Sequence, residues 1–323
     1  MYAIVVEEHG GPEQLEYKEV PEPTPGPGQV LLKMSATSVN FADVKMRRSL
    51  YRNKKPPFTP GFDGVGTIEA LGEGVRGLHV GQRVAAYVKS GSYAEKAIAL
   101  QELCYPIDES ISDENGIGIG VMITAYNALT RAGNLKMGED VLIHAGAGGI
   151  GSTAIQIARV LGAKRIFTTV GSTSKERLAK QLGADEVILY EEEDFAERIQ
   201  DVTDGRGVDL ILDTIGGKVF EKGLDCLADF GRLVIFGHSS SEAGMGSSKP
   251  LHRHNRSIIG YSSGGIRRHN PSELQSIASI VLDLVSNEKI RVFVGGAYPL
   301  KQAADAHRLV ESRKSTGKIV LYP

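Results

Sequence analysis

The pattern of hydrophobic and polar positions changes near Gly120. Before that point, short apolar runs are separated by turns rich in glycine and proline, as at residues 29–34, 66–70 and 83–88. Short strands bounded by such turn signals are typical of an all-β domain. The first 120 residues are therefore expected to form a compact, partly closed β domain.

From residue 121 onward, strand-like and helical segments alternate. Apolar residues recur at helical spacing between Ile150 and Leu161, and Gly162 follows as a helix stop. A second helix is expected over residues 175–182, ended by Gly183. Buried strands are expected at residues 141–145, 165–170, 186–189, 210–213 and 233–236. This alternation predicts a parallel sheet covered by helices, an α/β fold.

The last part of the chain returns to mixed structure. Ser272 and Gln275 have the spacing of a capping box, which would open a helix with Leu274 and Leu284 on its apolar face. Another helix is expected over residues 302–311. A final strand at 318–321 is expected to rejoin the N-terminal β domain, because chain ends commonly meet.

Composition narrows the classes of function. The chain has 323 residues, enough for two domains, and a net charge of −2 that argues against a nucleic-acid surface. No apolar stretch approaches the ~18 residues of a membrane span, and the N-terminus lacks the pattern of a signal peptide. Cys104 and Cys226 form neither a CxxC motif nor a Cys/His cluster, so a reducing, cytoplasmic location is expected.

The strongest local signal is a glycine-rich loop that fits G-x-G-x-x-G at Gly146, Gly148 and Gly151. It directly follows an expected strand and opens an expected helix, which is the context of a dinucleotide-binding loop. The first glycine is expected to permit a tight turn, the second to let the backbone approach a pyrophosphate, and the third to let helix and strand pack closely. The helix N-terminus would offer unpaired N–H groups to the phosphates.

The residues about 20 positions further on indicate the type of cofactor. An NAD site usually has a carboxylate there for the ribose hydroxyls, whereas residues 171–175 read Gly-Ser-Thr-Ser-Lys. The hydroxyl of Ser172 and the cation of Lys175 suit a 2′-phosphate, which a carboxylate would repel. We therefore expect NADPH, although Lys175 taken alone also fits a solvated lysine in a first helical turn.

Several segments together give the chain a family resemblance. They are 39–43 (Val-Asn-Phe-Ala-Asp), 60–64 (Pro-Gly-Phe-Asp-Gly), 81–84 (Gly-Gln-Arg-Val), 138–145 with the glycine loop, 236–237 and 311–313. The chain resembles the quinone oxidoreductase branch of the medium-chain dehydrogenase/reductase superfamily along nearly its whole length. The resemblance implies a GroES-like catalytic domain over 1–120 and 262–323, a doubly wound Rossmann domain over 121–261, and a homodimer formed through the Rossmann sheets.

The same resemblance implies roles for individual residues. Asn40 and Tyr51 would lie by the nicotinamide and the substrate, with Tyr51 also explicable as packing. Lys45 stands where several bacterial relatives have tyrosine, and it either donates a proton or points to water. Phe236, which also fits a plain core position, would line the nicotinamide half of the site. The implied cofactor contacts are Asn40, Thr124, Gly146, Gly148, Gly149, Ile150, Gly151, Ser172, Lys175, Tyr190, Phe236, Gly237, Ser239 and Arg313.

The comparison also argues against zinc. Zinc alcohol dehydrogenases of the superfamily have Gly-His-Glu where this chain has Gly-Phe62-Asp63, and a ligand cysteine where it has Asn40. Zinc needs three or four N, S or O ligands, and the closely spaced His252 and His254 have no third ligand nearby in the sequence. No metal is therefore expected.

Without a metal, the oxidation of alcohols is poorly supported, because nothing polarises the oxygen. We expect an NADPH:quinone oxidoreductase that transfers hydride directly. An NADPH-dependent reductase of enals, enones or enoyl thioesters uses the same scaffold and remains an alternative. A third possibility is a structural protein that binds NADPH without turnover.

Overall fold

The computed structural model describes residues 1–51, 54–89 and 91–323. The chain divides into two compact units, one formed by Met1–Gly120 with Ile266–Pro323 and the other by Val121–Gly265. Both ends of the chain thus build the first unit, and its second segment begins at Ile266 rather than at residue 262. Each unit is described below by itself.

The first unit is built on a six-stranded sheet in the order β13-β14-β3-β4-β5-β6. Strand β3 also pairs with β6, so the sheet curls back on itself into a partly closed barrel. The C-terminal strand β14 runs antiparallel to β3 with Ile319 opposite Val39, which confirms that residues 318–321 rejoin the N-terminal half. The strands are β3 (Gln29–Val39), β4 (Asp63–Leu71), β5 (Arg83–Val88), β6 (Lys96–Pro106), β13 (Val294–Pro299) and β14 (Lys318–Tyr322).

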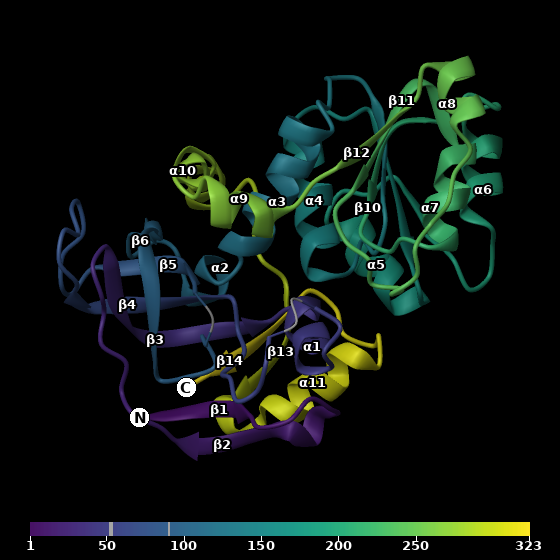
Figure 1. Cartoon of the computed structure of the whole chain (residues 1–323). Coiled ribbons are helices and arrows are strands. Elements are labelled where there is room, and N and C mark those ends of the chain that lie inside the picture. Colours follow the sequence, from purple (N-terminus) through teal and green to yellow (C-terminus); the bar gives the residue numbers. More distant parts are fainter. Residues whose placement is uncertain (52–53, 90) are drawn as a thin grey trace. The chain divides into compact units, whose positions relative to one another are not determined.

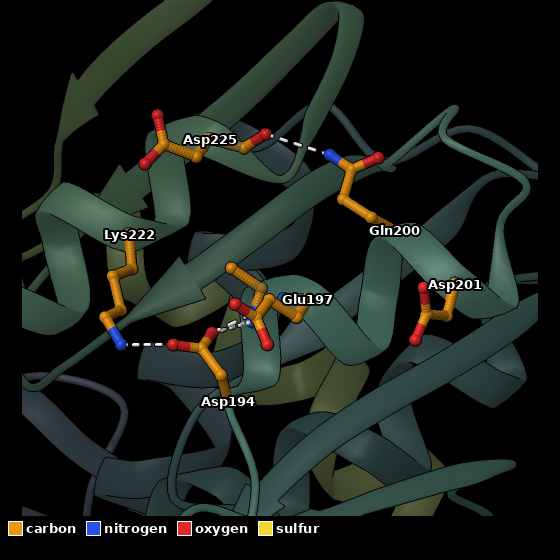
Figure 2. Close-up of a pocket in the computed structure, with 7 residues that line it drawn as sticks. Asp194, Glu197, Gln200, Asp201, Lys222 and Asp225 are labelled. Carbon is orange, nitrogen blue, oxygen red and sulfur yellow. Dashed lines mark hydrogen bonds and ion pairs between the residues drawn. The ribbon is translucent and has the colours of Figure 1, made fainter.

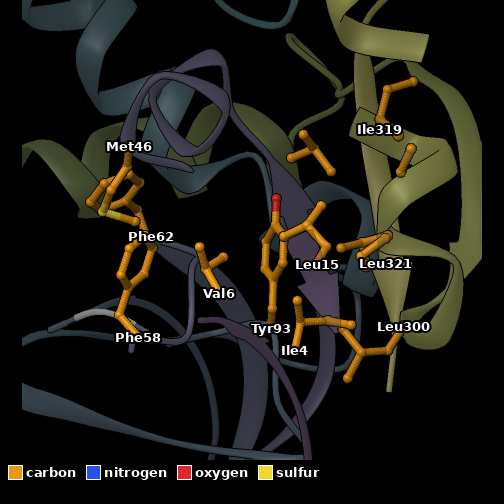
Figure 3. Close-up of a cluster of buried hydrophobic side chains, with 13 residues drawn as sticks. Ile4, Val6, Leu15, Met46, Phe58, Phe62, Tyr93, Leu300, Ile319 and Leu321 are labelled. Atoms are coloured by element: carbon orange, nitrogen blue, oxygen red, sulfur yellow. The ribbon is translucent and has the colours of Figure 1, made fainter. Parts of the chain in front are cut away.

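Among the described residues of this unit, two clusters of buried apolar side chains contribute to its core. One lies inside the curled sheet and includes Val30, Leu32 and Val84. The other joins the outer hairpin β1 (Tyr2–Val6) and β2 (Leu15–Glu19) to the C-terminal segment, with Ile4 and Leu321 fully buried (Figure 3). Because these apolar side chains come from both ends of the chain, their burial fixes the two segments together.

Four helices complete the first unit: α1 (Phe41–Arg47), α2 (Asp113–Gly116), α10 (Glu273–Ser286) and α11 (Ala303–Glu311). The expected capping box at the start of α10 is wrong. Ser272 has helical φ and ψ and makes no side-chain cap, and Gln275 Nε2 instead donates to the carbonyls of Glu102 and Cys104, at 2.8 and 3.3 Å. The side-chain amide of Gln275 therefore binds backbone carbonyls of β6 instead of the start of its own helix. The spacing of Ser272 and Gln275 in the sequence could not reveal these distant acceptors.

The second unit contains a six-stranded parallel sheet in the order β12-β11-β10-β7-β8-β9. The chain starts in the middle at β7, adds β8 and β9 on one side, and then β10, β11 and β12 on the other. The strand order therefore reverses between β7 and β10, which makes that place the topological switch point of a doubly wound fold. The strands are β7 (Asp140–Ile143), β8 (Arg165–Val170), β9 (Glu186–Leu189), β10 (Val208–Asp213), β11 (Leu227–Ile235) and β12 (Ser257–Gly260).

Helices cover both faces of this sheet. Figure 1 shows α4 (Gly149–Val160) on one side of β10, and α6 (Phe195–Val202) and α7 (Lys218–Asp225) on the other. Alternate strand residues face the two layers, and Leu142 and Ile211 pack with Phe195 and Phe220 under α6 and α7. The other helices of the unit are α3 (Ile119–Asn127), which begins just before the boundary, α5 (Thr173–Gln181), α8 (Ser248–His254) and α9 (Ser263–His269), which ends beyond it. In the described part of the chain, no helix has the length and apolar character needed to cross a membrane.

Candidate functional site

The glycine loop joins β7 to α4, but its tight turn is made by a residue other than the expected one. Ala145 takes the left-handed conformation with φ +58°, whereas Gly146 does not have a positive φ. Glycine is needed at position 146 for lack of space instead, because a Cβ there would lie 2.0 Å from Thr168 Oγ1 on the neighbouring strand. The turn is tied to β8 through Gly146 N–H, which donates to the Thr169 carbonyl at 3.1 Å.

The other two glycines have the geometry that a pyrophosphate site requires. A Cβ on Gly151 would lie 2.1 Å from the Ala145 carbonyl oxygen, so only glycine lets α4 approach the turn. A Cβ on Gly148 would meet only that same oxygen, at 3.2 Å, and would otherwise fill open space. Gly148 caps α4 in an extended conformation, and the first N–H groups of a helix, here from Gly149 and Ile150 onward, have no partner within it. These N–H groups and the open space above Gly148 fit a bound phosphate.

The next strand end carries polar groups, and no carboxylate stands between β8 and the first turn of α5. Ser172 caps α5, and its hydroxyl lies 3.1 Å from that of Ser174. Lys175 is half-buried, and burial lowers the pKa of its ammonium group. The first carboxylate in α5 belongs to Glu176, which is paired with Lys180 at 2.7 Å. The electrostatic character of this strand end therefore favours an anion.

Tyr190 follows β9 and lies beside the same strand end. Its backbone N–H donates to the Val170 carbonyl at 3.2 Å, and its hydroxyl is so close to Gly171 that a Cβ there would lie 2.6 Å from it. Its side chain is 44% exposed, which leaves the ring face accessible to a ligand. The structure thus brings Tyr190 to the segment that holds Ser172.

On the other side of the switch point, the segment after β11 runs against the end of β10. Phe236 N–H donates to the Asp213 carbonyl and Ser239 N–H to the Thr214 carbonyl, both at 3.0 Å. Gly237 admits no side chain, because a Cβ would lie 2.5 Å from Thr214 Oγ1. Phe236 is half-buried at this strand end, not part of the deep core.

These segments lie in a defined order along the carboxyl edge of one sheet. Residues 236–239 follow β11, the glycine loop follows β7, residues 172–175 follow β8, and Tyr190 follows β9. Neighbouring strands lie about 4.8 Å apart, so the edge offers a row of positions that an extended ligand can occupy. The carboxyl edge at a switch point is where open α/β sheets bind dinucleotides.

Among the sites expected from the sequence, Asn40, Lys45, Tyr51 and Arg313 belong to the first unit. Asn40 Nδ2 donates to Asp63 Oδ1 at 3.1 Å, and its Oδ1 accepts from Lys318 Nζ at 2.8 Å. Asp63 Oδ1 also accepts from the Ser38 hydroxyl at 2.6 Å. The amide of Asn40 is therefore held at both ends, which fixes its orientation.

Tyr51 and Lys45 flank the hydrophobic core of the same unit. The ring of Tyr51 is half-buried and meets Phe62 edge-on, with ring centroids 6.2 Å apart. Lys45 is half-buried on α1, and burial lowers its pKa. Arg313 is exposed just after α11, and Thr124 is half-buried on α3 in the second unit.

The residues at the position of the zinc site do not fit a metal. Phe62 has no ligand atom and is buried, and Asp63 Oδ1 accepts hydrogen bonds from Ser38 and Asn40. His254 is paired with Asp229 at 2.8 Å. Across residues 1–51, 54–89 and 91–323, no three His, Cys, Asp or Glu side chains are grouped as metal ligands.

Sequence reasoning missed several buried polar residues that support Asn40. Asp43 accepts the Asn40 N–H at 2.8 Å, the return half of a capping box, and also the Gly61 N–H at 3.0 Å. The spacing of Asn40 and Asp43 could have revealed the first contact. No local signal points to Lys318, which is distant in sequence.

A depression between α6 and α7 is not a candidate for the cofactor (Figure 2). Its walls carry four carboxylates, and its one cation, Lys222, is paired with Asp194. An acidic lining repels phosphate groups. The carboxyl edge of the parallel sheet therefore remains the better site for a dinucleotide.

Comparison with known proteins identifies the family. Residues 26–132 match the family model for an alcohol dehydrogenase GroES-like domain, and residues 149–280 match that for a zinc-binding dehydrogenase. A quinone oxidoreductase of Pseudomonas aeruginosa is 34% identical over 98% of this chain and 97% of its own length. The chain belongs to the quinone oxidoreductase family of the medium-chain dehydrogenase/reductase superfamily. The expected fold, a GroES-like domain with a Rossmann domain, is confirmed.

Two further members of the medium-chain superfamily bear on the site. The Escherichia coli quinone oxidoreductase, solved in complex with NADPH, superposes with a TM-score of 0.93 at 31% identity over the whole of both chains. A 2-haloacrylate reductase of a Burkholderia species is 32% identical over 99% of this chain and 98% of its own length. Proteins that resemble this chain to a similar degree in sequence thus carry names that refer to different acceptors.

Proposed function

We propose that this member of the quinone oxidoreductase family reduces quinones with NADPH, by direct hydride transfer and without zinc. The observation that carries the proposal is the state of Phe62 and Asp63: Phe62 has no ligand atom, and Asp63 Oδ1 already accepts hydrogen bonds from Ser38 and Asn40. These two residues do not supply the three or four ligands that would hold a metal able to polarise an alcohol or a simple carbonyl. An acceptor that delocalises the incoming charge needs no metal.

NADPH is the cofactor, and its place follows the order of segments along the sheet edge. The N–H groups at the start of α4 suit the pyrophosphate, because they are unpaired within the helix. Ser172, Lys175 and Tyr190 suit the 2′-phosphate end, since the strand end combines donors, one cation and an aromatic ring. Phe236, Gly237 and Ser239 suit the nicotinamide half. Thr124 and Arg313 are assigned to the nicotinamide ribose and to the adenine side.

In the proposed mechanism the nicotinamide supplies the hydride, and the protein orients the acceptor and handles its charge. Asn40, held at both ends by Lys318 and Asp63, presents a fixed amide as a hydrogen-bond donor. Tyr51 supplies an aromatic face beside Phe62. Lys45 is the proposed proton donor to the reduced oxygen, because burial lowers its pKa and so makes the proton easier to release.

A second candidate function is the reduction of α,β-unsaturated carbonyl compounds. The similarity to a 2-haloacrylate reductase favours it, because such an acceptor also takes hydride into a conjugated system. Enals, enones and enoyl thioesters share that property.

A panel of acceptors tests the proposal. The purified protein is given NADPH with a 1,4-benzoquinone, an enone, an enoyl-CoA and 2-chloroacrylate, and the loss of NADPH absorbance is followed. We expect the highest kcat/KM for the quinone, and a higher value for one of the other three would favour the second function. Binding of NADPH in a fluorescence titration without turnover of any acceptor would support the structural alternative instead.

We also propose a homodimer formed through the second unit. Strand β12 is the edge of the parallel sheet, and Ile258 on it is 39% exposed. An edge strand presents unpaired backbone groups that can extend the sheet with a second copy. Light scattering should give twice the chain mass, and Ile258→Asp should shift it toward the monomer. An unchanged mass would argue against this edge.

A cytoplasmic location is proposed on the state of the cysteines. Cys104 and Cys226 are both free and buried. Buried free thiols are usual where the compartment is reducing.

A further inference from the structure

Four buried side chains in the first unit form a continuous line of hydrogen bonds. Arg47 Nη1 lies 3.3 Å from His307 Nδ1, and His307 Nε2 lies 3.1 Å from the Tyr93 hydroxyl. The Tyr93 hydroxyl in turn is hydrogen-bonded to the carboxyl group of Asp43. All four residues have no exposed surface, so each polar group needs a partner within the fold, and Arg47 has two further partners in the Gly10 carbonyl and Glu311.

The chemistry of these groups fixes the direction of the line. A guanidinium group only donates, so His307 Nδ1 must accept from Arg47. Burial and the charge of Arg47 lower the pKa of His307 to about 3, so the ring is neutral and carries its proton on Nε2. That N–H donates to the Tyr93 oxygen, and the Tyr93 proton is directed to Asp43. Every donor therefore points from Arg47 toward the carboxylate.

Asp43 is the point at which this line meets the candidate site. Its Oδ2 accepts the N–H of Asn40, and its Oδ1 accepts the N–H of Gly61. Gly61 has φ +101° and opens the segment that carries Phe62 and Asp63. One carboxylate thus ties together the two segments whose side chains meet at Asn40 and Asp63.

Tyr93 is well placed for this task. Its ring is packed among apolar residues, and its hydroxyl oxygen points away from Ile4 (Figure 3). The ring of His307 meets it edge-on with centroids 5.7 Å apart. The ring positions are therefore fixed by packing, which keeps the hydroxyl aimed at one partner.

We propose that Arg47, His307 and Tyr93 form a one-directional hydrogen-bond relay that holds Asp43 as a carboxylate, and that Asp43 thereby acts as the positioning residue for Asn40. The proposal rests on the proposed function, since the role of Asn40 in hydride transfer belongs to it.

Protonation of Asp43 would weaken this arrangement. A neutral carboxyl group loses the charge that strengthens the hydrogen bonds from Asn40, Gly61 and Tyr93. The groups facing Asp43 are the backbone N–H of Asn40 and of Gly61, the carboxylate of Asp63, the ammonium of Lys318 and the hydroxyl of Tyr93. Burial and Asp63 raise the pKa of Asp43 to about 7, against the opposing effects of Lys318 and the two N–H groups. The relay therefore matters most near neutral pH.

The substitution Tyr93→Phe tests the relay, because it removes one donor to the carboxylate and keeps the ring. We expect the acidic limb of the pH profile of kcat/KM, with NADPH and a 1,4-benzoquinone, to move upward by about one pH unit. At pH 9 the variant should approach the native value. A merely structural defect would lower kcat/KM by the same factor at every pH, and that result would overturn the proposal.

Tyr105→Phe is the matched control. Tyr105 is fully buried in the same unit, and its hydroxyl has no hydrogen-bond partner in the described part of the chain. Its removal should leave the acidic limb unchanged. An equal shift in Tyr105→Phe would show that the effect is not specific to the relay.

A direct titration separates this proposal from the proposed function. The Asp43 carboxyl is followed by carbon-13 NMR in protein labelled at aspartate, with Asp43→Asn used to assign the signal. The apparent pKa of Asp43 should rise by about one unit in Tyr93→Phe, which removes the hydroxyl donor. It should rise less in His307→Phe, because Tyr93 then keeps its hydroxyl but no longer has the histidine N–H that directs the hydroxyl proton toward Asp43. An unchanged titration in both variants would refute the relay. Absence of quinone turnover with a shifted titration would refute only the link to hydride transfer.

Discussion

At the scale of single residues, the glycine loop shows that a motif position can be required for a reason other than the expected one. Ala145, not Gly146, adopts the left-handed conformation of the turn. Gly146 is excluded from carrying a side chain by Thr168, on the adjacent strand. The motif was therefore correctly located, whereas the reason for its first glycine depends on the neighbouring strand.

The cofactor preference is also decided by single residues. Lys175→Glu should raise the Kd for NADPH by about 100-fold, because a cation beside the 2′-phosphate is replaced by an anion. The Kd for NADH should change by less than about 3-fold. Lys164→Glu makes the same change of charge at an exposed residue just before β8, at the opposite end of that strand, and should leave both values nearly unaltered. Fluorescence titration measures all three proteins, and equal losses for the two cofactors in Lys175→Glu would contradict the assignment.

Asp43 predicts a pH dependence of stability. Its pKa is raised by burial to about 7, so its contribution to stability is fully present below its unfolded value near 4 and is lost as the pH rises through 7. The loss amounts to up to about 4 kcal/mol in the free energy of unfolding. In Asp43→Asn, the free energy of unfolding should not show this decrease with rising pH. Denaturant unfolding between pH 5 and pH 8 compares the two proteins, and parallel curves would contradict the prediction.

At the scale of elements, helix starts illustrate how neighbours compete for the same side chain. Gln275 has the spacing of a capping residue in α10 but donates to two carbonyls of β6. Asp43 has the same spacing in α1 and does accept the N–H of Asn40. The difference lies in which acceptors and donors the surrounding sheet brings within reach.

The β7–α4 turn gives a prediction in which two glycines behave differently. Gly151→Ala should destabilise the protein by about 1–3 kcal/mol, because its Cβ would lie 2.1 Å from the Ala145 oxygen. Gly148→Val should leave the melting temperature nearly unchanged and abolish the binding of NADPH, since the side chain enters open space that the pyrophosphate needs. Calorimetry and fluorescence titration measure the two effects. Normal binding by Gly148→Val would show that the phosphate lies elsewhere.

At the scale of the whole molecule, the candidate residues are divided between the two units. The second unit supplies the sheet edge with the glycine loop, and the first supplies Asn40, Tyr51 and Lys45. Because both chain ends build the first unit, the strand β14 with Lys318 is as much a part of the site as β3 is.

The proposed independence from zinc is a property of the whole enzyme. Elemental analysis of the purified protein should find well below one zinc per chain, and dialysis against EDTA should leave kcat unchanged, because Phe62 has no ligand atom and Asp63 Oδ1 is hydrogen-bonded to Ser38 and Asn40. One zinc per chain, with activity lost on chelation and restored by zinc, would overturn the mechanism.

The sequence by itself determined the features encoded within about 20 residues. The strand–helix alternation after residue 121, the position of the glycine loop and the absence of a carboxylate at residues 171–175 all depend on local periodicity and spacing. The expected strands at 165–170 and 186–189 agree with β8 and β9 in both bounds. These local signals predict the structure correctly because each strand–helix segment packs into the parallel sheet in the same way as its neighbours.

Only the tertiary structure decided how the polar side chains combine. Lys318 reaches Asn40 across 278 positions, and Arg47 reaches His307 across 260. These contacts exist because β14 pairs with β3 and α11 packs beside α1, and neither pairing leaves a periodic trace in the sequence. A buried polar group must find a partner wherever the fold brings one, so its partner is a property of the packed molecule.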